Sequence, residues 1–518
     1  MWRCDCFVVL LALSFGVAAV VAQDVNEWKE YGCDDPNVSG KAACFCGFLS
    51  DAENPIESPP VAAMSFAALA ATPCSGGSAG GYPCSNVALQ SVIPLSTFGS
   101  SSANDIWGWT HSSGREFAII GLRDGTGFVE ITNPSSPVYL GKLETHTFSS
   151  SWRDIKTYND HAFIVSEASG HGVQVFDLND LLDVTNAPAT FSNTYHINYV
   201  GSAHNIAINE DTGFAYVVGA SQCSGGLAMF DISNPTSPGP LRCFSGDGYT
   251  HDVHCVIYNG PDTPYLGREI CFASNEDTVT IVDVTDKLNP VQLSRNGYTN
   301  DGYTHQGWLT EDHTYFVFGD ETDETGQGID TKTLVFDVSN LNSPTYAGSH
   351  FGTSKAIDHN LYIRDGITYL ASYRAGLRIL QPNNLATASF DEIGYFDIYP
   401  ASNSANFNGA WSVYPFFESG NVVVSGIEQG LFVLLPDILA GPPEPTGTPT
   451  TPAPSIPTTP APVSPCTNIR VEVLTDDWAY ETTWEIRVDD NVVESGGGYS
   501  DFQTYVRDVC VDTSAGNN

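Results

Sequence analysis

Short runs of apolar residues, separated by turn residues, dominate the middle of the chain. One clear stretch reads as three strands, at residues 152–155, 162–167 and 172–177. A Pro-containing turn and one more strand usually follow, as at residues 133–140. No long segment carries the period of an amphipathic helix. Because Gly, aromatic and β-branched residues are also frequent, the pattern predicts an all-β chain built from short strands.

This strand pattern repeats along the chain. The stretch Asp247-Gly248-Tyr249-Thr250-His251 recurs unchanged as Asp301-Gly302-Tyr303-Thr304-His305. A second marker, an apolar strand that ends in aspartate, runs in step with it. Its aspartates are Asp177, Asp231, Asp283 and Asp337, which lie 54, 52 and 54 residues apart. A fixed period of this length indicates a repeat architecture.

Each repeat opens with a bulky aromatic residue or a histidine at the start of its first strand. The seven openings are Trp107, Trp152, His204, His251, His305, His359 and Trp411. They lie 45, 52, 47, 54, 54 and 52 residues apart. Four strands in each repeat of this length are typical of a propeller blade. Residues 86–435 are therefore predicted to form a seven-bladed β-propeller.

The two ends of the repeat region suggest how the ring closes. The last repeat, residues 411–435, has three strands before the composition changes, and residues 87–95 form a spare strand ahead of the first opening. We expect this N-terminal strand to complete the last blade, which leaves no unpaired edge inside the ring. An open solenoid or two sandwiches would not explain a missing strand at one end and a spare one at the other.

The N-terminal flank carries targeting features. Residues 1–22 look like a secretory signal peptide, because Arg3 precedes the apolar run of residues 7–13 and small residues follow. No later stretch reaches the 18 or so apolar residues of a spanning helix. We therefore expect a soluble protein that is secreted or held at the cell surface. Residues 23–85 are predicted to be irregular and contain an N-glycosylation sequon at Asn37.

The C-terminal flank divides into two parts. Residues 441–465 are rich in Pro, Thr, Ala and Ser and are predicted to form an extended, O-glycosylated linker. Residues 466–518 are acidic, and two alternating stretches predict a small β module. This module either binds a matrix or wall polymer or is a passive cap.

Cysteines in an exported protein are read first as disulfides. Of the 13 cysteines, Cys4 and Cys6 belong to the signal peptide, which leaves eleven. The plausible pairs are Cys223–Cys243, Cys255–Cys271 and Cys466–Cys510. The remaining five form an odd N-terminal set, so one thiol is free or paired between chains. These five are Cys33, Cys44, Cys46, Cys74 and Cys84.

The charge of the chain limits its partners. Sixty acidic and 20 basic residues give a formal net charge of -40. Such a charge argues strongly against nucleic acid or an anionic membrane surface as partner. We interpret it as an acidic coat that keeps a secreted protein soluble.

The repeat motifs resemble a known family. Segments such as residues 279–291 look like LVIVD repeats, and the blade openings resemble those of choice-of-anchor B proteins. These openings are Trp152-Arg153-Asp154-Ile155, Ala203-His204-Asn205-Ile206, Thr250-His251-Asp252-Val253, Thr304-His305-Gln306 and Asp358-His359-Asn360. The resemblance covers most of residues 86–435. It implies a secreted or surface-attached propeller whose C-terminal attachment device varies, and it implies no settled biochemical activity.

The blade openings also carry the candidate chemistry. Four successive blades open with His204, His251, His305 and His359, and Asp252 and Asp358 lie beside them. Inner strands begin on one rim of the channel, so we expect these six residues to surround one divalent cation at its mouth. Further carboxylates follow the second strands and are expected at the same rim: Glu167, Glu276, Asp320, Glu321 and Glu428. The structural alternative is that these polar groups satisfy backbone groups and channel water.

The other histidines rank below these four. His254 lies three residues after His251, on the opposite face of the strand, and is a weaker candidate. The rest fall at turns or outer strands and are expected at the surface: His111, His146, His161, His171, His196, His313 and His350.

Two function classes follow from this arrangement. One is an extracellular binding or adhesion module. The other is a metal-dependent hydrolase of lactones, esters or phosphoesters, in which the rim histidines hold a cation that activates water. No motif specifies a nucleophile, a phosphate cradle or a nucleotide pocket, and this favours binding.

Overall fold

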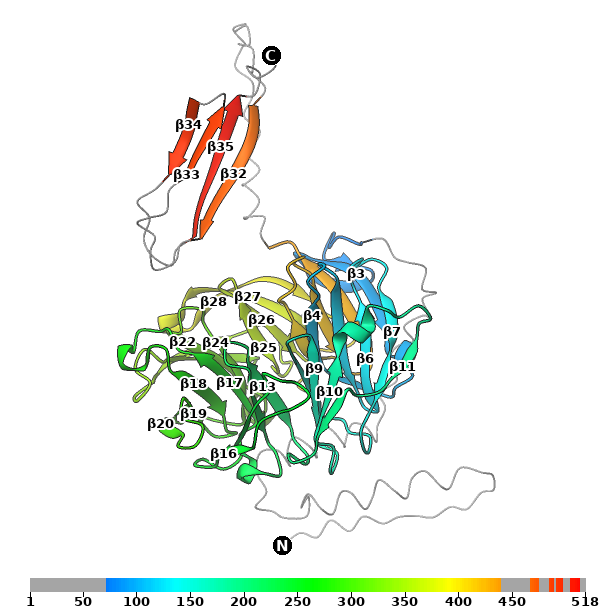
Figure 1. The fold of residues 1–518 in the computed structure, drawn as a ribbon, viewed down its shortest axis with the longest axis vertical. Coiled ribbons are helices and arrows are strands. Elements are labelled where there is room, and N and C mark those ends of the chain that lie inside the picture. Colours follow the sequence, from blue (N-terminus) through cyan, green and yellow to red (C-terminus); the bar gives the residue numbers. More distant parts are fainter. Residues whose placement is uncertain (1–70, 439–465, 475–483, 489–490, 497–503, 513–518) are drawn as a thin grey trace, which may run out of the picture. The chain divides into compact units, whose positions relative to one another are not determined.

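Seven antiparallel sheets follow one another between residues 87 and 436 and form the blades of one propeller (Figure 1). The computed structural model describes residues 71–438, and in the C-terminal part residues 466–474, 484–488, 491–496 and 504–512. The seven-bladed, all-β architecture predicted from the repeats is confirmed.

The first four blades each contain four main strands, which follow one another along the chain except that β11 intervenes in blade 2. Blade 1 contains β4 (Ala103–Thr110), β5 (Glu116–Leu122), β6 (Gly125–Glu130) and β7 (Val138–Glu144). Blade 2 contains β8 (Arg153–Tyr158), β9 (His161–Ser166), β10 (Val173–Asp177) and β12 (Tyr195–Ile197). Blade 3 contains β13 (Asn205–Asn209), β14 (Phe214–Val218), β15 (Leu227–Asp231) and β16 (Arg242–Phe244). Blade 4 contains β17 (Asp252–Ile257), β18 (Glu269–Ser274), β19 (Val279–Asp283) and β20 (Val291–Asn296).

The last three blades complete the ring. Blade 5 contains β21 (Thr304–Leu309), β22 (Tyr315–Asp320), β23 (Lys332–Asp337) and β24 (Thr345–Phe351). Blade 6 contains β25 (Leu361–Arg364), β26 (Ile367–Ser372), β27 (Gly376–Asn384) and β28 (Ser389–Phe396). Blade 7 contains β29 (Ala410–Tyr414), β30 (Val422–Gly426) and β31 (Gly430–Pro436).

The outer strand of blade 7 comes from the other end of the repeat region. β3 (Val87–Pro94) pairs antiparallel with β31, from Val87 opposite Pro436 to Pro94 opposite Gly430. The expected closure by an N-terminal strand is therefore confirmed. The short helix α3 (Leu95–Phe98) then leads the chain into blade 1.

The repeated aspartate at the end of each third strand has a local structural role. One side-chain oxygen accepts a hydrogen bond from the backbone N–H two residues further on. The four bonds are Asp177 from Asn179 at 3.0 Å, Asp231 from Ser233 at 2.8 Å, Asp283 from Thr285 at 3.1 Å and Asp337 from Ser339 at 2.9 Å. Such a bond fixes the turn that follows the strand, which explains why the same residue recurs in successive blades.

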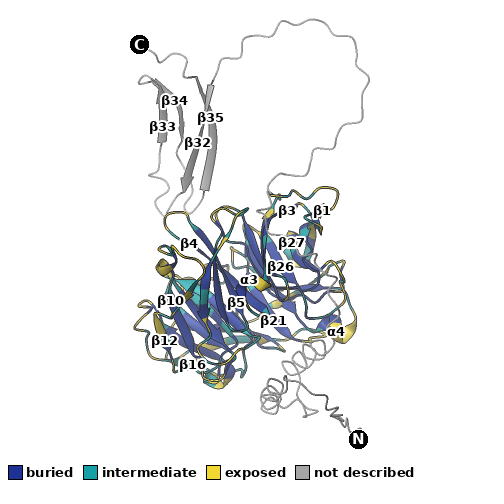
Figure 2. Ribbon diagram, turned by 90° about the vertical axis from the view of Figure 1, so that its right-hand side faces the viewer, coloured by how far each residue is buried: buried dark blue, intermediate teal, exposed yellow. Residues whose placement is uncertain are grey.

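The core lies between neighbouring blades, where apolar side chains of their middle strands pack together. Phe128 of blade 1 contacts Phe176 of blade 2 with ring centroids 4.7 Å apart, and Phe272 of blade 4 lies 5.6 Å from Phe316 of blade 5. All four side chains are fully buried. Burial is concentrated in the strands, and most exposed residues lie in the loops (Figure 2).

Three short strands extend two of the blades. β11 (Ala189–Phe191) pairs in parallel with β7 at the edge of blade 1. Residues 78–85 were expected to be irregular, but β1 (Ser78–Ala79) pairs with β2 (Tyr82–Ser85), which adds to β28 of blade 6. Pairing of β2 with β28 holds this segment on the ring, and a disulfide between Cys74 and Cys84 closes the segment on itself.

The predicted disulfides can be checked within the propeller. Cys223–Cys243 and Cys255–Cys271 are both present, as expected. Cys33, Cys44, Cys46 and Asn37 lie outside the described residues, as do residues 1–22 and the linker at 441–465. No helix in the described part of the chain is both long enough and apolar enough to cross a membrane.

The C-terminal unit contains strands, in agreement with the β module expected there. β32 (Cys466–Leu474) pairs with β35 (Thr504–Asp512), and β33 (Trp484–Val488) pairs with β34 (Asn491–Gly496). The side chains of Cys466 and Cys510 lie outside the described part of the structure, so their pairing stays a prediction.

Candidate functional site

The inner strands of the seven blades surround the channel. Equivalent residues of these strands lie at the same level along the channel, and we call each such level a tier. Aligning these strands on their pairing with the second strands places His204, His251, His305 and His359 in one tier. The same alignment adds Asn104 of blade 1, Arg153 of blade 2 and Trp411 of blade 7. The predicted openings Trp107 and Trp152 were therefore wrong by three residues and one residue. Both errors arose because a tryptophan lies close to the true position.

The four histidines form a continuous arc around one end of the channel, which we call the histidine end. The ring centroids of His204 and His251 are 4.1 Å apart, those of His251 and His305 are 4.2 Å apart, and those of His305 and His359 are 4.4 Å apart. The four residues expose between 2% and 7% of their surface. The sequence prediction that they converge is confirmed.

Several imidazole nitrogens of this arc already have protein partners. Nδ1 of His204 lies 2.6 Å from Oε1 of Glu167. Nδ1 of His251 lies 3.0 Å from the carbonyl oxygen of His305, and Nδ1 of His359 bonds to the carbonyl oxygen of Trp411. These contacts orient the rings by tying each blade to a neighbour.

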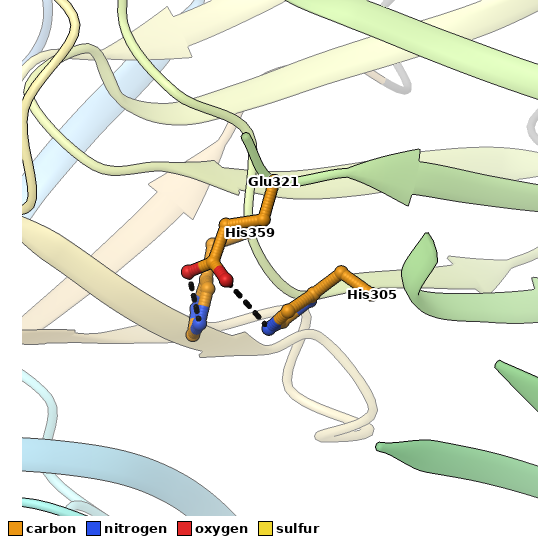
Figure 3. Close-up of side chains that lie close together, drawn as sticks. All are labelled: His305, Glu321 and His359. Atoms are coloured by element: carbon orange, nitrogen blue, oxygen red, sulfur yellow. Dashed lines mark ion pairs between the residues drawn. The ribbon is translucent and has the colours of Figure 1, made fainter. Parts of the chain in front are cut away.

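Glu321 lies between His305 and His359 (Figure 3). Its Oε2 is 3.6 Å from Nε2 of His305, and its Oε1 is 3.4 Å from Nε2 of His359. The hydroxyl of Tyr373 donates a hydrogen bond to Oε1 at 2.8 Å. One candidate ligand atom from each of these three side chains lies within 4.8 Å of the others. Glu321 is therefore the carboxylate that the fold brings to the histidines.

Burial keeps the imidazoles of His305 and His359 neutral. It lowers the pKa of His359 to about 3. For His305, burial and then the charge of its histidine neighbours lower the pKa well below the usual value. Because a neutral imidazole is the form that binds metal, the environment favours the metal-binding state.

The two aspartates predicted for this site lie elsewhere. Asp252 occupies the next tier, where its Oδ2 accepts a hydrogen bond from Asn205 at 3.0 Å and its Oδ1 accepts one from the backbone N–H of Val253 at 2.5 Å. Asp358 belongs to a separate cluster with Asp323 and Glu324. A neighbour along a strand points to the other face, which is why proximity in sequence misled the prediction.

Residues in the tier next to the histidines join the blades to one another. Oδ2 of Asp154 in blade 2 accepts from the N–H of Ile206 in blade 3 at 2.7 Å. The amide of Gln306 in blade 5 donates to the carbonyl of Leu361 in blade 6 at 2.9 Å and accepts from its N–H at 2.8 Å. For this tier the structural interpretation, satisfaction of buried backbone groups, is correct.

One histidine expected at the surface is fully buried. His171 contacts the guanidinium of Arg153 at 3.0 Å through Nε2 and the carbonyl of Gly172 at 2.9 Å through Nδ1. Burial first, and the Arg153 charge second, lower its pKa to about 3. The prediction that His171 lies at the surface was wrong. The turn that carries it folds inward, and its ring contacts the buried guanidinium of Arg153.

A cavity of about 550 Å³ lies farther along the inner strands, and all seven blades contribute to its wall. The tier three residues beyond the histidine tier contributes one residue from each blade to the wall. It consists of Trp107, Lys156, Ala207, His254, Trp308, Tyr362 and Tyr414. Phe416, Glu210 and Asp211 add to it, and we call the whole space the aromatic cavity.

The aromatic rings of this cavity support one another. Trp308 stacks on His254 at 3.7 Å between centroids and meets Tyr362 edge-on at 5.1 Å. Trp107 meets Tyr414 at 5.1 Å. Trp308 and Phe416 are partly exposed, whereas Trp107, Tyr362 and Tyr414 are buried. Sequence analysis missed this site because only the corrected alignment puts an aromatic residue or histidine at this tier in five of the seven blades.

Charged groups line another part of the aromatic cavity. Nζ of Lys156 lies 2.7 Å from Asp154, 3.8 Å from Asp105 and 4.4 Å from the ring of Trp107. Burial, reinforced by Asp154, raises the pKa of Asp252 to about 7. Glu210 and Asp211 are exposed at the cavity. The lining therefore carries more acidic than basic groups.

The comparisons with known proteins agree with the propeller class. Residues 200–241 match the family model described as LVIVD repeat, and this stretch spans the first three strands of blade 3. The fold and this match define a seven-bladed β-propeller that contains an LVIVD repeat. No curated protein matches the chain.

Among solved structures, the computationally designed Ika8 protein is 11% identical with a TM-score of 0.40, covering 64% of this chain and 82% of that one. A functionally unknown protein from Desulfotomaculum acetoxidans is 11% identical with a TM-score of 0.42, covering 60% and 88%. A protein from Lactobacillus plantarum is 13% identical with a TM-score of 0.43, covering 62% and 88%. At these TM-scores the likenesses support no functional conclusion for this chain.

Proposed function

We propose that this chain is a secreted or cell-surface binding module of the choice-of-anchor B type. Its aromatic cavity would receive part of a neutral glycan, such as the end of a matrix or wall polymer. The observation that carries the proposal is the cavity itself, about 550 Å³ lined by aromatic rings together with carboxylates and amides. This volume lies within the range of small-ligand sites.

The chemistry of the lining suits a sugar. The C–H faces of sugar rings pack on aromatic side chains such as Trp308 and Phe416. Sugar hydroxyls pair with planar polar groups, and Glu210, Asp211 and Asn209 supply such groups at the cavity. The acidic lining and the net charge of -40 disfavour polyuronates and sulfated glycans. We therefore propose an uncharged glycan as the ligand.

Trp308→Ala should weaken this binding strongly. We expect neutral oligosaccharides from a panel of β-glucans and chitin fragments to bind the wild-type chain in calorimetric titrations. We expect Trp308→Ala to weaken the affinity at least tenfold, because the apolar area buried on one indole and the contact with its ring together contribute about 1.5–3 kcal/mol. Phe148→Ala is the matched control, since Phe148 is 67% exposed in the loop between blades 1 and 2. Binding of acidic glycans alone, or equal binding by the Trp308 variant, would contradict the proposal.

At the histidine end, we propose that His305, His359 and Glu321 hold one divalent transition-metal ion. Two imidazoles and a carboxylate are a common ligand set for such ions. Elemental analysis of the purified chain should find about one equivalent of metal, and His305→Gln or His359→Gln should lose it. His161→Gln, at the first residue of β9, should keep it. A metal-free wild-type protein, or variants that retain the ion, would show that these histidines only join the blades.

No feature of the described residues specifically supports the hydrolase alternative. All four histidines are almost fully buried, and the space they line is much smaller than the aromatic cavity. We therefore assign recognition to the aromatic cavity and a structural role to a cation at the histidine end.

A further inference from the structure

A second group of acidic side chains lies between blades 5 and 6. Asp323 and Glu324 belong to α4 (Asp323–Gln327), in the connection between β22 and β23, and Asp358 stands just before β25. One oxygen of each carboxyl group lies within 4.8 Å of those of the other two. The three residues expose 1%, 2% and 0% of their surface. They are buried carboxyl groups in mutual contact and not a solvated acidic loop.

Most oxygens of this cluster lack a donor. Lys332 forms an ion pair with Asp323, and its backbone N–H donates to Oε1 of Glu324 at 3.1 Å. Both oxygens of Asp358, Oε2 of Glu324 and Oδ1 of Asp323 have no hydrogen-bond partner among the described residues. Buried carboxylates without donors are costly and rare in native proteins.

The neighbouring Asp320 shows what a purely structural carboxylate looks like in the same loop. It accepts hydrogen bonds from the N–H groups of Gly302 at 2.8 Å and Tyr303 at 2.6 Å, and from the hydroxyl of Tyr298 at 2.9 Å. Asp358 has no equivalent set. The difference indicates that the partner of Asp358 is something other than a protein donor.

Electrostatics leads to the same conclusion. Asp358 is fully buried, and one oxygen of its carboxyl group lies within 4.8 Å of a carboxyl oxygen of Asp323 and of Glu324. The ammonium of Lys332 offsets the charge of one carboxylate. The remaining carboxyl groups must either hold protons or share a multivalent cation.

The oxygen geometry selects the kind of cation. Ca²⁺ binds oxygen ligands at about 2.3–2.6 Å, so two ligands on opposite sides of the ion lie roughly 4.6–5.2 Å apart. Oxygens within 4.8 Å of one another fit around such an ion. Gly319 helps to create the space, because a Cβ there would collide with Oδ2 of Asp358.

From these observations we infer that Asp323, Glu324 and Asp358 bind one Ca²⁺ ion that links blade 5 to blade 6. This site uses oxygen ligands alone and contains none of the histidines. It does not depend on the proposed glycan site, and its function is to hold two blades together in an extracellular medium.

The test uses the full chain after treatment with a chelator. Added CaCl₂ should raise the melting temperature in proportion to the logarithm of the free Ca²⁺ concentration. Calorimetric titration should give about one ion per chain. In Asp358→Asn and Glu324→Gln the affinity should fall at least tenfold. Asp330→Asn is the matched control, because Asp330 lies in the same connection and pairs with Lys355, with both side chains about half exposed.

The outcomes separate this site from the histidine end. His305→Gln should keep the full Ca²⁺ response while losing any transition metal. If millimolar Ca²⁺ neither binds nor changes the melting temperature of the wild-type chain, the carboxyl groups hold protons and the inference is wrong. The inference is also wrong if both Asp358→Asn and Glu324→Gln respond as the wild type does. If one of these two variants fails to fold, the other variant and the titration of the wild-type chain still test the inference.

Discussion

Deletion of residues 86–95 is expected to unfold the whole propeller and not only its last blade. The deletion removes β3, the strand that completes blade 7. It also removes Val87, Leu89 and Ile93 from the core, where they are 0%, 2% and 7% exposed. At about 1.5–3 kcal/mol for each buried side chain, the loss is comparable to the total stability of a typical domain, roughly 5–15 kcal/mol. Circular dichroism and thermal melting should show an unfolded or aggregated chain.

A transplanted strand provides the control for this deletion. β3 and β31 are antiparallel neighbours, so the sequence of residues 86–95 can be placed after residue 436 through a short hairpin turn. This permuted chain should fold and melt close to the parent protein. A deletion variant that melts like the parent would mean that β3 does not close the ring.

Lys156→Met is expected to cost about 3–5 kcal/mol of unfolding free energy, the range for removing one partner of a buried ion pair. The Lys156 side chain is 13% exposed, and its Nζ lies 2.7 Å from Asp154. Burial opposes ionisation of Asp154, but the charge of Lys156 together with hydrogen bonds from Asp105, the backbone N–H of Ile206 and Lys156 itself lowers the pKa of that carboxyl. Without the ammonium, Asp154 becomes an uncompensated charge. Chemical denaturation measures the difference.

Two further variants test whether charge is the cause. Lys355→Met removes an exposed ion pair and should cost about 0–1 kcal/mol. The double variant Lys156→Met with Asp154→Asn should recover much of the loss, because the Asn oxygen can still accept from Ile206. If the double variant is no more stable than Lys156→Met alone, packing and not charge explains the effect.

The sequence was sufficient for the fold because the features that define a blade are local. The Asp at the end of each third strand fixes its turn through a bond to a residue two positions away. The period of these four aspartates therefore reports the length of one blade, and the seven blade openings give the number of blades. The spare strand at residues 87–95 had one available place, the open edge of the last blade.

The sites were less predictable because they depend on contacts between blades. The four histidines could be found, since they occupy one tier of successive inner strands. Glu321 was expected at the same rim because it follows a second strand, but its choice as the carboxylate between His305 and His359 depends on the geometry of the β22–β23 connection. The buried cluster of Asp323 and Glu324 reads in sequence as an ordinary acidic loop. The aromatic cavity could be recognised only after the inner strands were aligned correctly. The sequence prediction misaligned them because it took Trp107 and Trp152 as blade openings.

The most direct test of the account is to locate the ligand. Crystals of the protein grown with the tightest-binding neutral oligosaccharide should show electron density for sugar rings in the aromatic cavity, packed against Trp308 and Phe416 and within hydrogen-bond distance of Glu210 or Asp211. Density for the sugar on the outer face of a blade or at the histidine end, with the aromatic cavity filled by water alone, would contradict it.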